Sequence, residues 1–477
     1  MRNRRRGLRP HLDILDDRCL LSGYASSAQT GYTPAQISSA YGLNAITLSS
    51  STGSTVKGDG SGETIALIEM YHDPNLTSDL KTFDAKYGLP NPSLTVVDQA
   101  GKQTDSGWAL EESMDVEWAH AIAPGANILV VEAAPSDSET QELTSLLNAV
   151  NTARNTAGVA VVSMSWGFDE MPKEASYDSY FTTPAGHSGI TFVASSGDNG
   201  SIEYPSASPN VLSVGGTTLS IGSSGSYGSE TVWTSGGGGY SQYEAEPTYQ
   251  NSVQSTGLRS TPDVAFDGDP STGAQVYSTP PGSTKGSWQV VGGTSLGAPA
   301  WAGLIAIADQ GRALAGKGSL DGPNQTLPAL YAGASSDYNT VTSASPYSPY
   351  GSGFSFGGFE PFGGFSHDFS FGFGFGFGSG MTGITTTGAG ATANTSTGLG
   401  SPQGASIISD LVSTNLASPV STAASTGHKG SGSAHTTPSK PTGKGTKHPV
   451  VHRRTITRSA TGHARALVHA RSSTEKP

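Results

Sequence analysis

Cysteine is almost absent from this sequence: Cys19 is the single one among 477 residues, so no disulfide can form within the chain. This excludes a disulfide-rich scaffold, and one thiol does not identify the redox compartment. Long hydrophobic runs are also missing, since no stretch approaches the roughly 20 apolar residues that span a bilayer. We therefore expect no membrane span, a core formed by the 35% hydrophobic residues, and many loops from the 64 glycines.

Basic residues are scarce everywhere except at the two ends. Residues 1–19 carry six arginines against three aspartates, and residues 428–477 carry ten lysines or arginines against one glutamate. The 408 residues between them hold 10 basic and 34 acidic groups. A central segment with so few cations gains little positive charge when its carboxylates are protonated. Repulsion between positive charges, which unfolds many proteins in acid, is therefore weak in it. The pattern suits work at low pH, but on charge alone we prefer simple solubility through excess acid.

Between residues 31 and 342 short apolar, β-branched runs alternate with helical patterns. The runs lie at 64–68, 127–131, 159–163 and 190–194, and helical patterns at 74–87, 110–121 and 138–155. Continuous apolar strands separated by helices predict an α/β fold, with a parallel sheet covered on both faces. Ligands of such sheets bind at the carboxyl ends of the strands, so site residues should follow these runs.

Three segments lie outside this pattern and bound a predicted domain at 31–415. Residues 1–30 are basic without the continuous apolar core of a signal peptide, and their RCLLS sequence resembles the leader of some large bacterial extracellular proteins. Residues 344–383 are rich in Phe and Gly, which predicts an expanded surface loop or a segment that self-associates. Residues 416–477 predict a disordered basic tail that adheres to anionic surfaces.

The first chemical segment is GGTSLGAPAWAG at 292–303, which runs into an apolar helical stretch. A serine between glycines leaves the backbone open to a substrate, and a helix N-terminus beside Ser295 stabilises negative charge. Pro299 suits the first helical turn, where its missing N–H has no cost. Taken alone, however, Ser295 fits an ordinary helix N-cap better.

The second segment is WALEESMDVEWAH at 108–120. Glu111 and Asp115 are four residues apart and so lie on one face of a helix. Four acids fall within seven residues with no Lys or Arg among them, and like charges at this spacing destabilise a helix by about 0.2–0.5 kcal/mol per pair. The alternative is an exposed acidic face, which is equally consistent with this segment by itself.

The third segment is ASSGDNG at 194–200, directly after an apolar run. It places Asp198 in a glycine-flanked turn at the carboxyl end of a predicted strand. Such a position suits a catalytic carboxyl group, although aspartate is also a common residue of plain turns and helix caps.

Together and in this order, the three segments closely resemble the sedolisins, acid-acting peptidases with a subtilisin-like fold. Further matching stretches are YTPAQI at 32–37, AHAIAPGA at 119–126, SMSWG at 163–167, PSASPNVLSVGGT at 205–217, SGGGGYS at 235–241 and PDVAF at 262–266. The resemblance covers about 31–342 and 388–412. Subtilisins proper carry their catalytic base in a His-Gly-Thr segment, and none of the four histidines between residues 31 and 415 has that setting.

The resemblance implies a role for each catalytic residue. Ser295 would attack the scissile carbonyl, Glu111 would accept its proton, and Asp115 would orient Glu111 through a hydrogen bond. Asp198, in its acid form, would donate a hydrogen bond to the oxyanion. Reference pKa values of about 3.9 and 4.3 for Asp and Glu then predict maximal activity between about pH 3 and 5. The SMSWG segment would supply the strand edge for the substrate backbone.

The family also carries a structural calcium site, which implies metal ligands in this chain. Asp337 and the Tyr338 carbonyl match its first half, and Gly390, Thr392 and Asn394 match its second half. Asn394 stands where the family has an aspartate, so a ligand charge is lost and we expect weak calcium binding or none. Sedolisins generally carry a long propeptide, whereas the match here begins near residue 31, so we expect no encoded prodomain.

The predicted function is that of a secreted, monomeric serine endopeptidase acting on protein or peptide substrates outside the cell or at its surface. Removal of tripeptides is an alternative mode that the sequence leaves open, and we expect no specific nucleic-acid partner. A non-catalytic surface or adhesion protein on the same scaffold is the main alternative, which the Phe/Gly segment and the basic tail favour. An esterase that uses Ser295 is a third, and it would cleave esters but not proteins.

Overall fold

The computed structural model describes residues 31–342 and 393–415. All of them belong to one compact unit, Met1–Ser421, and the second unit, Thr422–Pro477, lies outside the described residues. The predictions for the leader, the Phe/Gly segment and the basic tail also lie outside them. The boundaries of the predicted domain therefore stay a prediction.

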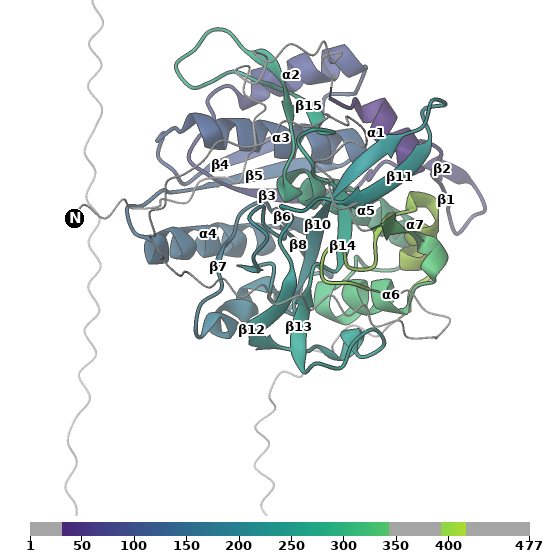
Figure 1. The fold of residues 1–477 in the computed structure, drawn as a ribbon. Helices are drawn as coiled ribbons and strands as arrows, with labels where there is room; N and C mark the ends of the chain where they lie inside the picture. The colour runs from purple at the N-terminus through teal and green to yellow at the C-terminus, as the bar shows by residue number, and fades with distance from the viewer. Residues whose placement is uncertain (1–30, 343–392, 416–477) are drawn as a thin grey trace, which may run out of the picture. The chain divides into compact units, whose positions relative to one another are not determined.

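A nine-stranded sheet forms the centre of the fold (Figure 1). In spatial order its strands are β18 (Val341–Thr342), β11 (Tyr227–Val232), β10 (Val211–Ile221), β8 (Thr191–Ser195), β6 (Val159–Met164), β3 (Thr64–Met70), β5 (Asn127–Ala133) and β4 (Leu94–Asp98), with β14 (Val264–Asp267) also beside β10. All neighbours from β10 to β4 are parallel, and β11 is antiparallel to β10. The predicted α/β class and the four apolar runs are confirmed.

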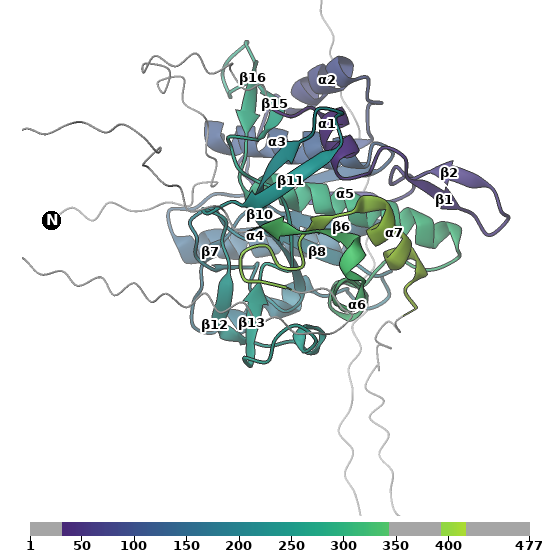
Figure 2. The same ribbon diagram turned by 45° about the vertical axis from the view of Figure 1, so that its right-hand side comes forward.

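Helices cover both faces of this sheet (Figures 1 and 2). One side carries α1 (Pro34–Ala40), α2 (Leu76–Tyr87), α3 (Ser106–Ile122), α5 (Thr294–Leu314), α6 (Leu327–Ala332) and α7 (Gly404–Ser413), and the other carries α4 (Glu139–Arg154). Strand residues alternate between the two cores: Ile65 and Leu67 pack toward α3 and α5, whereas Ala66 and Ile68 pack toward α4. This is why the strands read as continuous apolar runs.

Within the described residues, five two-stranded sheets lie outside the central sheet. They are β1 (Thr47–Ser49) with β2 (Thr55–Lys57), β7 (Phe168–Asp169) with β9 (Glu203–Tyr204), β12 (Gly239–Ala245) with β13 (Leu258–Thr261), β15 (Ala274–Ser278) with β16 (Ser287–Val291), and β17 (Tyr338–Asn339) with β19 (Ser401–Pro402). Short helical turns cover Glu174–Phe181, Thr248–Gln250, Gly322–Thr326 and Ser335–Asp337.

Helix α3 lies almost wholly inside the protein, which its acidic sequence did not indicate. It begins four residues before the predicted 110–121 pattern, because the Asp105 side chain caps it by accepting hydrogen bonds from the amides of Gly107 and Trp108. Fifteen of its 17 residues are buried, and its four acidic side chains are each at most 1% exposed. The alternative of an exposed acidic face is therefore wrong.

Candidate active site

Four sequence-predicted residues come from three elements that meet on one side of the sheet. Ser295 lies at the start of α5, Glu111 and Asp115 lie on α3, and Asp198 follows the carboxyl end of β8. Helices α3 and α5 pack against each other, which brings the serine to the two carboxyl groups. Gly293 precedes α5 with a φ of 115°, a conformation that side chains rarely adopt, so this sharp entry into the helix requires glycine.

The hydroxyl of Ser295 faces the carboxyl group of Glu111. The contact is close enough for the hydroxyl to favour the ionised carboxylate. The two groups nevertheless do not form a hydrogen bond of ordinary geometry, since neither Glu111 oxygen has a partner among the described residues. The pair is thus in contact without a formed hydrogen bond, as catalytic pairs without substrate often are.

Asp115 lies beside Glu111, but its hydrogen bonds go elsewhere. Its Oδ2 accepts a hydrogen bond of 2.6 Å from the Ser165 hydroxyl, and its carboxyl group lies close to that of Glu69, whose oxygens form no hydrogen bond of ordinary geometry among the described residues. The direct bond to Glu111 that the family pattern implies is not formed within the described residues, where the two groups interact through their charges. Asp115 thus joins two carboxyl groups, Glu111 toward the serine and Glu69 behind it.

Asp198 is held beside Ser295 by Thr294, the residue that precedes the serine. Its Oδ1 accepts hydrogen bonds from the amide and the hydroxyl of Thr294, at 2.8 and 2.7 Å. The Thr294 hydroxyl in turn accepts a hydrogen bond of 3.1 Å from the amide of Gly197. These contacts fix the loop after β8 to the N-terminus of α5, where an oxyanion formed at Ser295 would also lie.

The position of Pro299 differs from the prediction. Because α5 begins at Thr294, Pro299 is its sixth residue and lies beyond the first turn. A residue there would normally donate its N–H to the carbonyl of Ser295, four residues earlier, and proline cannot. The hydroxyl of Ser165 lies 3.2 Å from that carbonyl oxygen and can donate to it instead.

Burial raises the pKa of every carboxyl group in this cluster. Glu111, Asp115 and Glu69 are fully buried, and loss of hydration is the largest cause of the upward pKa shift in each. Mutual repulsion adds to the shift of Glu111 and Glu69, whereas the nearby Ser295 hydroxyl opposes the shift of Glu111 and the hydrogen bond from Ser165 opposes that of Asp115. The three groups therefore share protons and titrate as a unit.

Two residues of the carboxyl cluster around Asp115 were not predicted from the sequence. Glu69 is an acid inside the otherwise apolar strand β3, and that contrast is the signal that could have found it. Ser165 stands in the SMSWG segment, which we interpreted as a strand edge. That interpretation is wrong for Ser163, which pairs with β3 on one side and with β8 on the other. Met164 pairs with β8 alone, so an edge is available only from Met164 onward.

The described part of the predicted calcium site does not fit a calcium ion. The Asp337 carboxylate accepts hydrogen bonds from the Ser406 hydroxyl and from the Ala334 amide, the latter at 2.7 Å. Asn394 Oδ1 accepts two amide hydrogen bonds that close its own turn, at 2.8 and 2.9 Å. The cleft between these segments is lined by Tyr338 and Asn394, while Asp337 is not among its described lining residues.

Calcium takes six to eight oxygen ligands, and here the two side-chain donors are engaged in hydrogen bonds within the protein. The remaining predicted ligands, Gly390 and Thr392, lie outside the described residues. Among residues 31–342 and 393–415, no helix is long and apolar enough to cross a membrane.

Comparisons with known proteins agree with this architecture. Residues 100–352 match the model of the Subtilase family. Kumamolisin from Bacillus sp. (strain MN-32) is 33% identical over 324 residues, covering 60% of this chain and 53% of that protein. Sedolisin from Pseudomonas sp. (strain 101) is 31% identical over 322 residues, covering 61% of this chain and 52% of that protein. The chain thus spans about half the length of these curated relatives.

A solved structure of Pseudomonas sedolisin, described as a serine-carboxyl proteinase complexed with two molecules of pseudo-iodotyrostatin, aligns with this chain at a TM-score of 0.60 and 25% identity. The alignment covers 80% of this chain and 97% of that chain.

Proposed function

Because this chain belongs to the subtilase family and to the sedolisins within it, we propose that it is a serine-carboxyl peptidase that hydrolyses peptide bonds at acidic pH. The observation that carries the proposal is the contact between the Ser295 hydroxyl and the buried carboxyl group of Glu111. A serine nucleophile needs a proton acceptor within reach, and here that acceptor is a carboxylate rather than an imidazole.

Acylation begins when Ser295 Oγ attacks the carbonyl carbon of the substrate. The Oγ–C bond forms as the hydroxyl proton passes to Glu111, and the carbonyl oxygen becomes an oxyanion. Protonated Asp198 donates a hydrogen bond to this oxyanion, and the N-terminus of α5 adds its positive potential. When the C–N bond breaks, Glu111 returns the proton to the leaving amine. Water then attacks the acyl-enzyme by the same steps and releases Ser295.

Asp115 acts on Glu111 through charge and proton sharing. With Asp115 and Glu69 protonated, Glu111 can stay ionised without a second buried charge beside it, and so it can act as the base. Ser165 orients Asp115 by its short hydrogen bond. Raising the pH removes protons from this cluster and from Asp198, which ends catalysis. Lowering it protonates Glu111, so activity is confined to a pH window between these protonation steps, and the raised pKa values of the buried carboxyl groups place that window higher than free Asp and Glu side chains would.

The wider setting is also a proposal. We infer protein or peptide substrates, cleaved internally or as N-terminal tripeptides, and action outside the cell or at its surface by a monomer whose basic tail binds anionic surfaces. Calcium, which sedolisins bind, has no support from the orientation of Asp337 and Asn394 and takes part in no step above.

The test is cleavage of a denatured, quenched protein substrate from about pH 2.5 to 8, comparing the wild type with Ser295→Ala. The proposal expects acid-optimal cleavage that the substitution abolishes. A folded wild type without activity at any pH would overturn it in favour of a non-catalytic surface protein, and cleavage of esters alone would favour the esterase.

A further inference from the structure

Three carboxylate residues form a row across neighbouring strands on the α3 side of the sheet. Glu69 of β3 pairs in register with Glu132 of β5, and Glu132 pairs in register with Asp98 of β4. Paired residues of adjacent strands project from the same face, so the three side chains lie next to one another. Glu69 and Glu132 are buried, whereas Asp98 is exposed on the outermost strand of this end of the sheet. Like charges in such a row are destabilising unless something offsets them.

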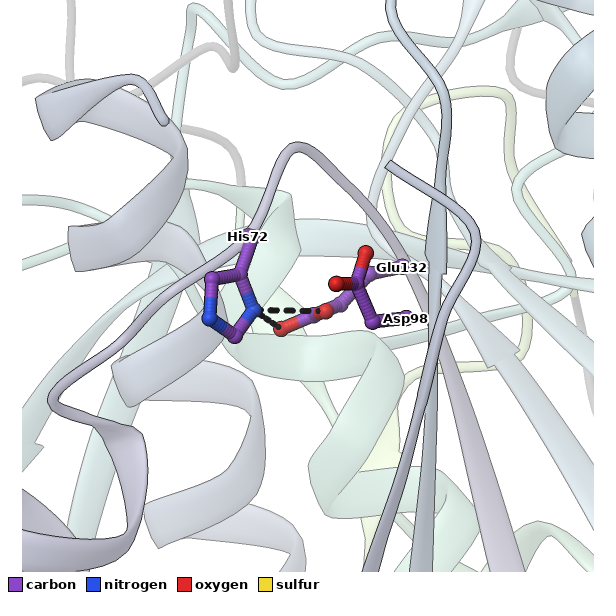
Figure 3. A group of neighbouring side chains, drawn as sticks. All are labelled: His72, Asp98 and Glu132. Atoms are coloured by element: carbon purple, nitrogen blue, oxygen red, sulfur yellow. Dashed lines mark hydrogen bonds and ion pairs between the residues drawn. The ribbon is translucent and has the colours of Figure 1, made fainter. Parts of the chain in front are cut away.

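His72 covers the outer end of this row. It lies two residues after the end of β3, and its ring Nδ1 lies 2.9 and 2.8 Å from the two carboxylate oxygens of Glu132 (Figure 3). The His72 side chain is 25% exposed, so the cluster can be reached from solvent. One ligand atom from each of His72, Asp98 and Glu132 can be chosen such that all three lie within 4.8 Å of one another.

An independent feature points to a cation at this place. Glu112, from α3, is 1% exposed, and its Oε1 has no hydrogen-bond partner among the described residues. The Glu112 carboxyl group lies within hydrogen-bond reach of Glu132, and Asp73 is a further acidic neighbour. A single imidazole therefore faces a group of carboxyl side chains, and one oxygen of the buried Glu112 carboxyl group beside Glu132 has no hydrogen-bond partner among the described residues. Such burial without compensation is costly.

From this arrangement we propose that His72, Asp98 and Glu132 bind a divalent transition-metal ion, for which Zn²⁺ is the probe. Imidazole nitrogen with carboxylate oxygens is a common Zn²⁺ donor set and discriminates against Ca²⁺ and Mg²⁺. Tetrahedral ligands at about 2.0–2.1 Å from Zn²⁺ are separated by roughly 3.3 Å, so His72 and Glu132 would move apart by only about half an ångström. Three protein ligands leave a fourth position for water.

The site is separate from the serine chemistry and does not depend on it. Its role follows from its place: the ion would neutralise the outer carboxylates of the row and fasten the turn after β3 to the edge of the sheet. Glu112 would act as a supporting group behind Glu132.

The test measures thermal unfolding of the full chain at pH 7 in a Ser295→Ala background, which prevents self-cleavage. Protein freed of metal with EDTA and then dialysed is compared with and without Zn²⁺. At a hundredfold excess over the dissociation constant, Zn²⁺ should raise the Tm by roughly 3–6 °C. His72→Ala should abolish this shift, and Asp98→Asn, an exposed and mild change, should weaken the affinity at least about tenfold. His187→Ala, a histidine outside the cluster, should behave like the parent.

The Tm is the deciding readout because the histidines of residues 428–477 can bind Zn²⁺ without stabilising the folded core. No shift in the parent, an equal shift in His72→Ala and the parent, or an equal shift with Mg²⁺ would each overturn the proposal and leave His72–Glu132 as an ion pair only. Because peptidase activity is silenced throughout, failure here says nothing against the proposed hydrolysis.

Discussion

Ser165 donates a hydrogen bond of 2.6 Å to Asp115, and the same hydroxyl lies 3.2 Å from the main-chain oxygen of Ser295. A hydroxyl has one proton to donate, so it cannot serve both acceptors at once. If Asp115 is protonated it can donate to Ser165, which then donates to the carbonyl that Pro299 leaves unpaired. The protonation of Asp115 is thereby coupled to the backbone of the nucleophile.

Removal of this hydroxyl should shift the pH dependence of catalysis. In Ser165→Ala, Asp115 loses a hydrogen bond that opposes its upward pKa shift, so its pKa rises further. We expect kcat/KM to fall about 10- to 100-fold and the pH profile to move upward, measured over about pH 2.5–8. Ser163→Ala is the matched control, because the buried Ser163 hydroxyl makes no hydrogen bond within the described structure. Equal profiles for both variants would exclude this role for Ser165.

Replacement of Asp198 should separate its two roles, which are donation of a hydrogen bond to the oxyanion and acceptance of hydrogen bonds from Thr294. Asp198→Ala removes the oxyanion donor and should lower kcat about 10²- to 10³-fold. Asp198→Asn retains an acceptor for Thr294 and a donor that does not titrate, so we expect it to keep more activity than the alanine variant and to lose less of it as the pH rises. The measurement is kcat against pH for both variants, and an alanine variant as active as the wild type would refute the oxyanion role.

Stability should fall as the pH rises from acid to neutral. Burial raises the pKa of Glu174 to about 7 and of Glu244 to about 8, and it raises the pKa of Asp309 in the same direction. Raised folded-state pKa values mean that the folded protein binds more protons than the unfolded chain. The resulting stability is full below about pH 4 and is lost as the pH rises toward about 8.

Urea unfolding of Ser295→Ala at about pH 4.5 and pH 8 checks this expectation. The midpoint should be higher at the acidic pH, provided the slope is the same. A higher midpoint at pH 8 would mean that ion pairs, rather than buried carboxyl groups, dominate the pH dependence.

Calcium should have little effect on stability. Asp337 is held by Ala334 and Ser406, and a calcium ion would have to break these hydrogen bonds to use its carboxylate. We expect the Tm in millimolar Ca²⁺ to differ from that in EGTA by less than about 1 °C. A rise of several degrees that Asp337→Asn removes would contradict this and restore the site that the family pattern implies.

The sequence by itself determined the elements and indicated the candidate reacting groups. Apolar runs and helical spacing are local properties, so the strands and the shared face of Glu111 and Asp115 could be inferred without knowing the fold. The serine at a glycine-flanked helix start and the aspartate after β8 were likewise visible. The structure brings these four residues together, and their roles stay predictions until activity is measured.

Only the tertiary structure decided what surrounds them. Strand β5 comes after both β3 and β4 in the chain, but it lies between them in the sheet. Glu132 therefore lies between Glu69 and Asp98. The same packing buries all of the acidic residues of α3, engages Asp337 with Ser406, and places Ser165 against a carbonyl that Pro299 cannot serve. Contacts between distant segments depend on strand order and helix packing, and no local pattern encodes either.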